Sequence, residues 1–220
     1  MKSHELAKYI DHSILHTDLT SKELFDFCQS AIRMGVFSVA INSCWVEETL
    51  KYLKGSGIIV DSSIGFPLGQ INRKGKIEEA RFAVSAGCHE LDMVMNIGAL
   101  KSGYYNYVKE EIADIVKIAE GRIVKVIIES GLLSDEQKVK ATQLIIGTGA
   151  SFVKTSTGFN NIQGATVHDI KLLKRISAGK IKIKASGGLT NLKKVLSMID
   201  AGADRIGTKY TENIMKEVSD

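Results

Sequence analysis

The stretch FVKTSTG at residues 152–158 joins an apolar run to small hydroxyl side chains and a glycine. The same arrangement returns in IKIKASGG at residues 181–188, which also carries a lysine near its polar end. Each stretch has the pattern of a buried strand that opens into a glycine turn. A helical pattern separates the two, so they indicate strands joined by a helix.

Lys154 and Lys184 stand near the ends of these two strands and decide the expected chemistry. Lysine is seldom fully buried without a partner or a chemical role, because taking an ammonium group out of water is costly. If both side chains enter one pocket, their charges repel and each lowers the pKa of the other. A lysine with a lowered pKa is partly neutral near neutral pH, so it can attack a carbonyl carbon and form a Schiff base. The alternative role of either lysine is a point charge that binds phosphate.

Outward from these two strands, the chain alternates strand and helix patterns from one end to the other. Strands joined by helices without a linker predict an α/β fold, a single (βα)8 TIM barrel over residues 1–220. An open doubly wound sheet is the alternative, but the Gly-x-Gly-x-x-Gly that usually follows its first strand is missing. The eight predicted strands are 9–15, 36–41, 58–64, 91–95, 123–128, 152–154, 181–184 and 205–207.

Hydroxyl and amide side chains mark where several helices are expected to begin. Thr20, with Glu23 three residues later, has the pattern of a capping box, and Gly35 is expected to end that helix. Thr166 and Asn191 stand in the same way before two further runs with apolar residues at helical spacing.

Composition narrows the class of protein. Hydrophobic residues make up 44% of the 220 residues, enough for a substantial core, and no apolar run is long enough for a membrane span. No secretory signal is apparent and Cys28, Cys44 and Cys88 are scattered, which predicts a cytoplasmic protein without a disulfide framework. The net charge of +4 is mild and no basic cluster alternates with aromatic residues, so neither nucleic acid nor a membrane is an expected partner.

In a (βα)8 barrel, functional side chains collect at the C-terminal ends of the strands. Asp92 lies within an apolar run, so an inward carboxylate would meet the lysines and shuttle protons; a plain ion pair is the open alternative. Lys125 and Glu129 share one face at strand spacing and are expected to form a buried pair. Asp11 is expected either to bind a substrate hydroxyl or to serve as a cap or turn residue.

Two glycine loops follow the last two predicted strands. Gly187 and Gly188 follow the seventh strand, and Gly207 and Thr208 follow the eighth. Loops at these places often bind phosphate through backbone N–H groups, although plain turn formation explains their glycines as well.

Two histidines raise the question of a metal site. His12 and His16 are four residues apart, a spacing that suits a metal only on a helix, and their segment has a strand pattern. No metal ligand is therefore expected.

Several motifs together resemble deoxyribose-phosphate aldolases, a family of class I aldolases. The most specific is VKTSTGF at residues 153–159, and the others stand in the family's order along nearly the whole chain. They are IDH at 10–12, GFPLG at 65–69, LDMV at 91–94, NIGAL at 96–100, KVIIE at 125–129 and KASGG at 184–188. The family fold is a (βα)8 barrel, which agrees with the strand pattern.

The resemblance implies reversible cleavage of 2-deoxy-D-ribose 5-phosphate to acetaldehyde and D-glyceraldehyde 3-phosphate. The open alternatives are a related Schiff-base aldolase with a different aldehyde or weak phosphate preference, and a non-catalytic relative that binds a sugar phosphate. It implies that Lys154 forms the Schiff base and that Lys184 lowers the pKa of Lys154 and relays protons. Asp92 would act with Lys184 and a water as the acid/base group, and Thr157 and Asp11 would position substrate and water. Because an iminium ion itself withdraws electrons, neither a metal nor another cofactor is expected. The expected partners are a sugar phosphate and aldehydes, and a homo-oligomer stays open.

The chain departs from the family pattern around the expected phosphate site. The residues at 189–190 are Leu and Thr where the glycine loop usually continues into a basic residue, and Lys209 and Tyr210 stand where small residues are usual. Ser43 replaces a usual proline, and the C-terminus lacks the tyrosine of many members. Lys209 is expected to replace the missing basic group. The implied substrate-binding residues are Asp11, Thr157, Gly158, Gly187, Gly188, Gly207, Thr208 and Lys209.

Overall fold

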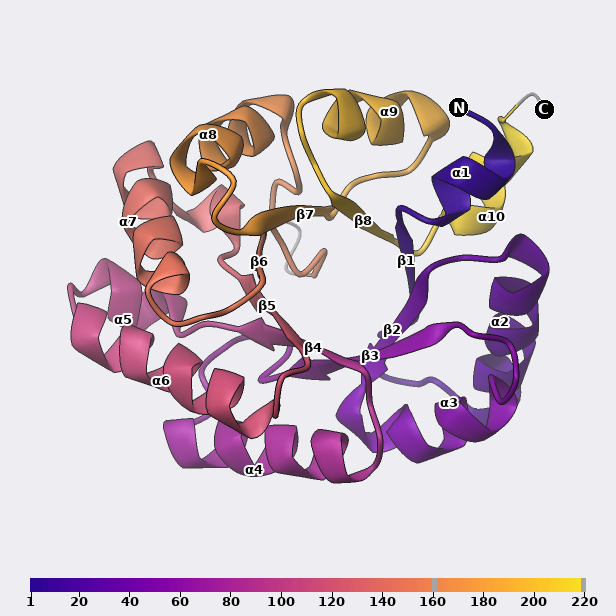
Figure 1. Ribbon diagram of the computed structural model, residues 1–220, viewed down its shortest axis with the longest axis horizontal. Coiled ribbons are helices and arrows are strands. Elements are labelled where there is room, and N and C mark those ends of the chain that lie inside the picture. The colour runs from indigo at the N-terminus through magenta and orange to yellow at the C-terminus, as the bar shows by residue number, and fades with distance from the viewer. Residues whose placement is uncertain (160–161, 219–220) are drawn as a thin grey trace.

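The computed structural model describes residues 1–159 and 162–218, and its eight parallel strands close into a barrel in chain order (Figure 1). The last strand pairs with the first, which closes the sheet. The predicted (βα)8 architecture is therefore confirmed. The strands are β1 (Ile10–Ser13), β2 (Ser38–Asn42), β3 (Ile59–Ile64), β4 (Glu90–Val94), β5 (Ile123–Ile127), β6 (Phe152–Lys154), β7 (Lys182–Ser186) and β8 (Arg205–Thr208).

Helices form an outer ring around the strands, and the two termini lie in the same part of the view (Figure 1). Within the described residues, no helix combines the length and the apolar composition needed to cross a lipid bilayer. The helices are α1 (Ser3–Ala7), α2 (Ser21–Met34), α3 (Val46–Tyr52), α4 (Arg73–Ser85), α5 (Ile97–Lys101), α6 (Tyr105–Ile118), α7 (Asp135–Ile146), α8 (Val167–Ser177), α9 (Leu192–Asp200) and α10 (Thr211–Lys216), with short 3-10 turns η1 (Ser43–Trp45) and η2 (Ser130–Leu132).

The predicted helix starts are confirmed by their caps. Thr20 accepts a hydrogen bond from the N–H of Glu23, whose carboxylate accepts one from the N–H of Thr20, and Gly35 ends α2 at φ +62°. Thr166 caps α8 and Asn191 caps α9. These caps satisfy N–H groups that have no partner inside their helices.

The strand register brings the two lysine segments into contact. Lys154 of β6 pairs with Lys184 of β7, and Ser186 further along β7 pairs with Gly207 of β8. Neighbouring residues across parallel strands point to the same face of the sheet. Lys154 and Lys184 therefore enter the barrel interior side by side.

Each strand is buried on both faces, but the two faces differ in chemistry. Residues such as Leu91, Met93 and Val126 belong to the apolar core. Alternate positions carry buried charged side chains, among them Asp61, Asp92 and Lys125. The centre of the barrel is thus a charged network enclosed by an apolar shell, which places ionisable groups in a poorly hydrated setting.

Candidate active site

Lys154 is the last residue of β6 and is only 3% exposed. Its Nζ lies 2.5 Å from Oδ2 of Asp92, which projects from β4. Burial of the ammonium lowers the pKa of Lys154; the negative charge of Asp92 opposes this effect, and the nearby charge of Lys184 adds to it. The amine is therefore easier to deprotonate than an ordinary lysine, which is the condition for nucleophilic attack.

Lys184 contacts the same oxygen of Asp92, at 2.7 Å, and so lies beside the nucleophile candidate. Its Nζ also lies 2.5 Å from Oδ2 of Asp11 and 3.1 Å from Oδ2 of Asp61. Burial by itself lowers the pKa of Lys184, but the charges of Asp11 and Asp92 outweigh it and the pKa is raised. The expectation that both lysines have lowered pKa values is thus wrong for Lys184, because it has three carboxylate neighbours and stays an ammonium ion.

Asp92 is the junction of the network. One carboxylate oxygen accepts hydrogen bonds from Lys154 and Lys184. The other accepts a 2.8 Å hydrogen bond from Lys125 of β5. Burial raises the pKa of Asp92, but the three ammonium groups more than reverse this and hold it well below the ordinary value. Asp92 is consequently ionised throughout the physiological range and orients proton donors around Lys154.

Further buried charges surround these residues, and three of them, Asp61, Glu90 and Arg205, were not predicted as part of the site. Lys125 Nζ lies 2.8 Å from Asp61 and 2.7 Å from Glu90. Arg205 donates to Asp11 at 2.7 Å, and its guanidinium stacks 3.6 Å from the centroid of the Phe37 ring. Asp61, Glu90 and Arg205 carry the same signal as Asp92, a charge within a strand pattern, which could have identified them.

Asp11 belongs to these buried charges and not to the rim. It is fully buried, accepts a 2.6 Å hydrogen bond from the hydroxyl of Ser38, and is paired with Lys184 and Arg205. In this position Asp11 fixes Lys184 through an ion pair, and none of its described contacts is with a residue at the mouth of the barrel.

The expected pair between Lys125 and Glu129 is not formed, since Lys125 is held by Asp61, Glu90 and Asp92. The strand pattern ends at Ile127, and Glu129 adopts a left-handed conformation with φ +48°. This turn directs its carboxylate away from Lys125. Glu129 instead accepts a 2.5 Å hydrogen bond from the hydroxyl of Thr157.

The loops after β6 and β7 are packed closely through glycines. Gly158 and Gly187 have φ of +78° and +87°, and a Cβ on Gly187 would lie 3.1 Å from Cα of Gly164. Gly188 has φ +73° and no described atom near its Cβ position, so its backbone faces open space. These left-handed conformations and close approaches are available to glycine at low cost.

Gly207 is required for a different reason, because the side chain of Lys184 passes close to it. A Cβ at this position would lie 3.1 Å from Cε of Lys184 and 2.9 Å from Oγ of Ser186. The missing side chain therefore leaves room for Lys184.

Thr208 lies at the end of β8, as predicted, but its hydroxyl has partners within the protein, and Lys209 follows it at the surface. The Thr208 hydroxyl donates a 2.7 Å hydrogen bond to the carbonyl of Leu189 and accepts one from the N–H of Tyr210. Lys209 lines a groove together with Arg33 of α2 and Asn213 of α10, outside the strand barrel. This placement does not support a direct contact between Lys209 and a phosphate in the barrel mouth.

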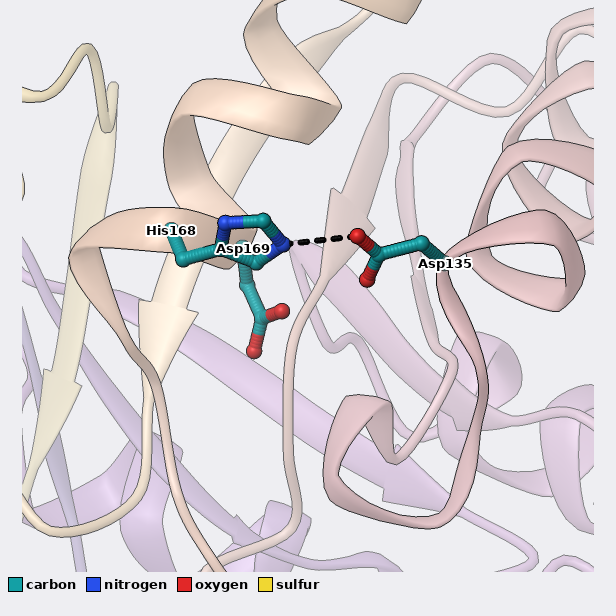
Figure 2. Close-up of side chains that lie close together, drawn as sticks. All are labelled: Asp135, His168 and Asp169. Atoms are coloured by element: carbon teal, nitrogen blue, oxygen red, sulfur yellow. Dashed lines mark hydrogen bonds and ion pairs between the residues drawn. The ribbon is translucent and has the colours of Figure 1, made fainter.

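Among the residues that the structure describes, two clusters of carboxylate or imidazole groups have the ligand types of a cation site. Figure 2 shows Asp135, His168 and Asp169, in which the His168 imidazole lies 2.8 Å from Asp135. Lys138 lies 3.1 Å from Asp135 and 2.7 Å from Asp169, so an ammonium group already bridges the carboxylates.

The second cluster comprises Asp11, Asp61 and Glu90 inside the barrel. Lys125 lies 2.8 Å from Asp61 and 2.7 Å from Glu90, and 4.0 Å from Asp11. In both clusters the lysine supplies the positive charge that a metal ion would bring.

A protein-family model, described as DeoC/LacD family aldolase, matches residues 5–216 of the chain. The chain belongs to this aldolase family. The aldolase is 46% identical over 220 residues to the deoxyribose-phosphate aldolase of Caldicellulosiruptor saccharolyticus, with 99% of this chain and 100% of the relative covered. It is 45% identical over 216 residues to the deoxyribose-phosphate aldolase of Thermococcus gammatolerans, with 96% of each chain covered.

Solved structures agree with this assignment. The aldolase resembles the structure titled "QR15, an Aldolase" with a TM-score of 0.93 and 39% identity, covering 97% of this chain and 95% of the other. It resembles the deoxyribose phosphate aldolase of Aeropyrum pernix, whose title describes a unique tetrameric structure, with a TM-score of 0.90 and 29% identity, covering 97% and 91%. The lysine and aspartate network thus lies in a barrel of the fold used by aldolases.

Proposed function

We propose that this protein is a lyase that cleaves 2-deoxy-D-ribose 5-phosphate reversibly into acetaldehyde and D-glyceraldehyde 3-phosphate, through a Schiff base on Lys154. The observation that carries the proposal is the shared contact of Lys154 and Lys184 with one oxygen of Asp92, at 2.5 Å and 2.7 Å. It supplies a reactive amine, a permanent ammonium and a permanent carboxylate in one buried site. The curated relatives named above carry the same activity in their names.

The reaction begins with the open-chain aldehyde of the sugar. The neutral Nζ of Lys154 attacks C1, and the resulting carbinolamine loses water to give an iminium ion. Burial lowers the pKa of Lys154, so its neutral amine forms more readily than that of an ordinary lysine. Lys184 remains protonated because Asp11 and Asp92 outweigh the effect of burial on its pKa. It is therefore the group that can protonate the departing hydroxyl.

Carbon–carbon bond cleavage follows from the iminium. The C3 hydroxyl loses its proton, the bond between C2 and C3 breaks, and the electron pair moves into the iminium to form an enamine. Glyceraldehyde 3-phosphate leaves, C2 of the enamine takes up a proton, and water hydrolyses the iminium to release acetaldehyde. We assign the proton relay to Lys184 and a water molecule. Asp92, whose pKa is far below the ordinary value, stays a carboxylate and orients that relay.

The phosphate is proposed to bind at the loop after β7. The backbone of Gly187 and Gly188 has positive φ at both residues, and the Cβ position of Gly188 is open. Successive N–H groups in such turns form anion-binding concavities. The sequence departures at residues 189–190 and at Lys209 then leave the backbone as the main phosphate contact.

We also propose that the protein self-associates and acts in the cytoplasm. Free Cys28, Cys44 and Cys88 support a reducing compartment. The similar solved aldolase whose title describes a tetrameric structure supports association between copies. Light scattering on the purified chain tests the assembly, and a monomer at all concentrations contradicts it.

Chemical trapping tests the proposed function directly. The protein is incubated with acetaldehyde, reduced with borohydride, digested and mapped by mass spectrometry. An ethyl group on Lys154 is expected, together with release of glyceraldehyde 3-phosphate from 2-deoxyribose 5-phosphate. A label confined to other lysines, or none, contradicts the assignment. Lys182→Ala, which removes an exposed lysine at the start of β7, serves as the matched control and is expected to leave labelling unchanged.

A further inference from the structure

Asp61 lies in the middle of β3, is fully buried and has no role in the proposed reaction steps. Its Oδ2 lies 2.8 Å from Nζ of Lys125 and 3.1 Å from Nζ of Lys184. Its other oxygen has no hydrogen-bond partner among the described residues. A buried carboxylate with one unpaired oxygen is costly, so its presence calls for an explanation in terms of charge.

Asp61 is one of the carboxylates that hold the buried cations by ion pairs. Four cations, on Lys125, Lys154, Lys184 and Arg205, are paired with Asp11, Asp61, Glu90 and Asp92. Glu129 is a further buried carboxylate whose charge acts on Lys154, but its hydrogen bond is with Thr157. Loss of the charge of Asp61 would leave the ion-paired groups with three carboxylates for four cations, which favours loss of a proton from the most easily deprotonated cation.

We propose that Asp61 controls how readily Lys154 loses its proton, by adding a negative charge to the network beneath the nucleophile and holding Lys125 and Lys184 in place. The inference rests on the proposed Schiff-base role of Lys154. Asp61 is a positioning residue, since it touches Lys184 and Lys125 and acts on Lys154 through charge.

The direction of the electrostatic effects agrees with this proposal. Burial raises the pKa of Asp61 to about 6; Asp92 adds to the increase, and the charges of Lys125 and Lys184 oppose it. The charge of Asp61 in turn raises the pKa of Lys154, against the lowering by burial. The negative charge at Asp61 therefore appears as the pH rises through the weakly acidic range, and it then restrains deprotonation of Lys154.

Several strands contribute charged or titratable groups to this balance, whereas β2, which pairs with β3 beside Asp61, contributes none, and Glu129 follows β5 and acts on Lys154. Asp11 lies on β1, and Arg205 on β8 also feels the charge of Asp61. Glu90 and Asp92 lie on β4, and the Cys88 thiol, just before β4, has its pKa raised to about 12 by burial and by Asp61. The remaining groups are Lys125 on β5, Lys154 on β6 and Lys184 on β7.

The test is the pH dependence of Lys154 reactivity in Asp61→Asn, which keeps the shape of the side chain and removes its charge. The initial rate of labelling by acetaldehyde and cyanoborohydride is measured from acidic to alkaline pH. Removing a negative charge lowers the pKa of Lys154. The acidic limb of the plot of labelling rate against pH is therefore expected to move to lower pH by about one unit. A limb that coincides with wild type, or moves to higher pH, overturns the proposal.

Ser62→Ala is the matched control on the same strand. It removes a buried hydroxyl that has no hydrogen-bond partner among the described residues, without changing any charge. Its acidic limb is expected to coincide with that of wild type. A shift equal to that of Asp61→Asn assigns the effect to packing of β3 and overturns the proposal.

Asp61→Asn removes a carboxylate partner from the buried ammonium groups of Lys125 and Lys184, which could prevent folding. A second comparison applies in that case. Lys125→Met is compared with the double variant Asp61→Asn/Lys125→Met, in which one charge of each sign is removed. The difference between their acidic limbs isolates Asp61. The acidic limb of the double variant is expected at lower pH than that of Lys125→Met. Coincidence of the two acidic limbs overturns the proposal. Absence of labelling in wild type contradicts the Schiff base itself and is thereby distinguished from failure of the inference.

Discussion

The hydroxyl of Thr157 donates a 2.5 Å hydrogen bond to Oε2 of Glu129, and the N–H of Thr157 lies 3.3 Å from each oxygen of that carboxylate. Glu129 is buried and its φ of +48° is an unfavourable conformation for a residue with a side chain. The pair links the turn after β5 to the loop after β6. Because Thr157 stands three residues after Lys154, the pair fixes the loop that follows the nucleophile.

We predict that Glu129→Gln lowers kcat/KM by about 10-fold, through loss of the geometry around Lys154. An amide is uncharged, so the hydrogen bonds from Thr157 are no longer charge-assisted and become weaker. Steady-state kinetics of the retro-aldol reaction provide the measurement. Thr157→Ser, which keeps both donors, is expected to stay close to wild type. Equal activity of Glu129→Gln and wild type shows that the pair has no part in catalysis.

Lys184→Leu and Asp92→Asn are each expected to slow turnover by at least about 10²-fold, the lower range for positioned acid/base groups. Lys184→Leu also removes a charge that lowers the pKa of Lys154, so labelling of Lys154 should require a higher pH. Turnover and the pH dependence of trapping are measured in parallel. Retention of nearly full turnover in both variants refutes their assigned roles.

Lys209→Ala tests the sequence-based expectation of a replacement phosphate ligand against the observed groove. From its position with Arg33 and Asn213, we predict less than about a twofold increase in KM for 2-deoxyribose 5-phosphate, since a distant exposed charge is screened by salt. The non-phosphorylated sugar is the control substrate. A several-fold increase for the phosphorylated substrate alone restores Lys209 as a phosphate contact.

His12 makes stability depend on pH. Burial lowers its pKa to about 4, against an ordinary value of 6.5, while a hydrogen bond with the Thr208 backbone and the charge of Glu212 oppose the shift. The unfolded chain therefore binds the proton more readily. Stability from the neutral imidazole is present above pH 6.5 and is lost as the pH falls toward 4, by about 3 kcal/mol in total.

The measurement is the free energy of unfolding by urea at several pH values in this window, for wild type and His12→Gln. The variant is expected to lose less stability on acidification, and the contribution of Asp61, present in both proteins, cancels in the difference. His16→Gln, in the same segment but exposed, is the control. Equal pH dependence of the free energy of unfolding in wild type and His12→Gln would show that His12 does not cause the loss of stability in acid.

The barrel could be predicted from the sequence because its strands are buried on both faces and read as apolar runs. The ends of the strands were less certain, since pairing and not apolarity sets them. The segment at residues 9–15 forms only β1 (Ile10–Ser13), because the chain turns away after Ser13. The C-terminal departure includes Ser219 and Asp220, which lie outside the described residues.

The nucleophile and its partners could be predicted in part. Lys154, Lys184 and Asp92 are single charges in apolar surroundings, and the structure brings them together. Asp61 was missed because the serines beside it make that strand look less buried. The direction of Lys209 could not be predicted, since the turn between β8 and α10 sets it and spacing alone does not reveal a turn.

The contact between Gly164 and Gly187 has a consequence for reshaping this enzyme. A Cβ on Gly164 would lie 2.2 Å from the carbonyl oxygen of Gly187, so neither loop can gain a side chain there unless the other moves. Laboratory evolution toward new acceptor aldehydes would therefore find single replacements of Gly164 or Gly187 blocked. Libraries that exchange both loops together would open routes that stepwise mutation cannot follow.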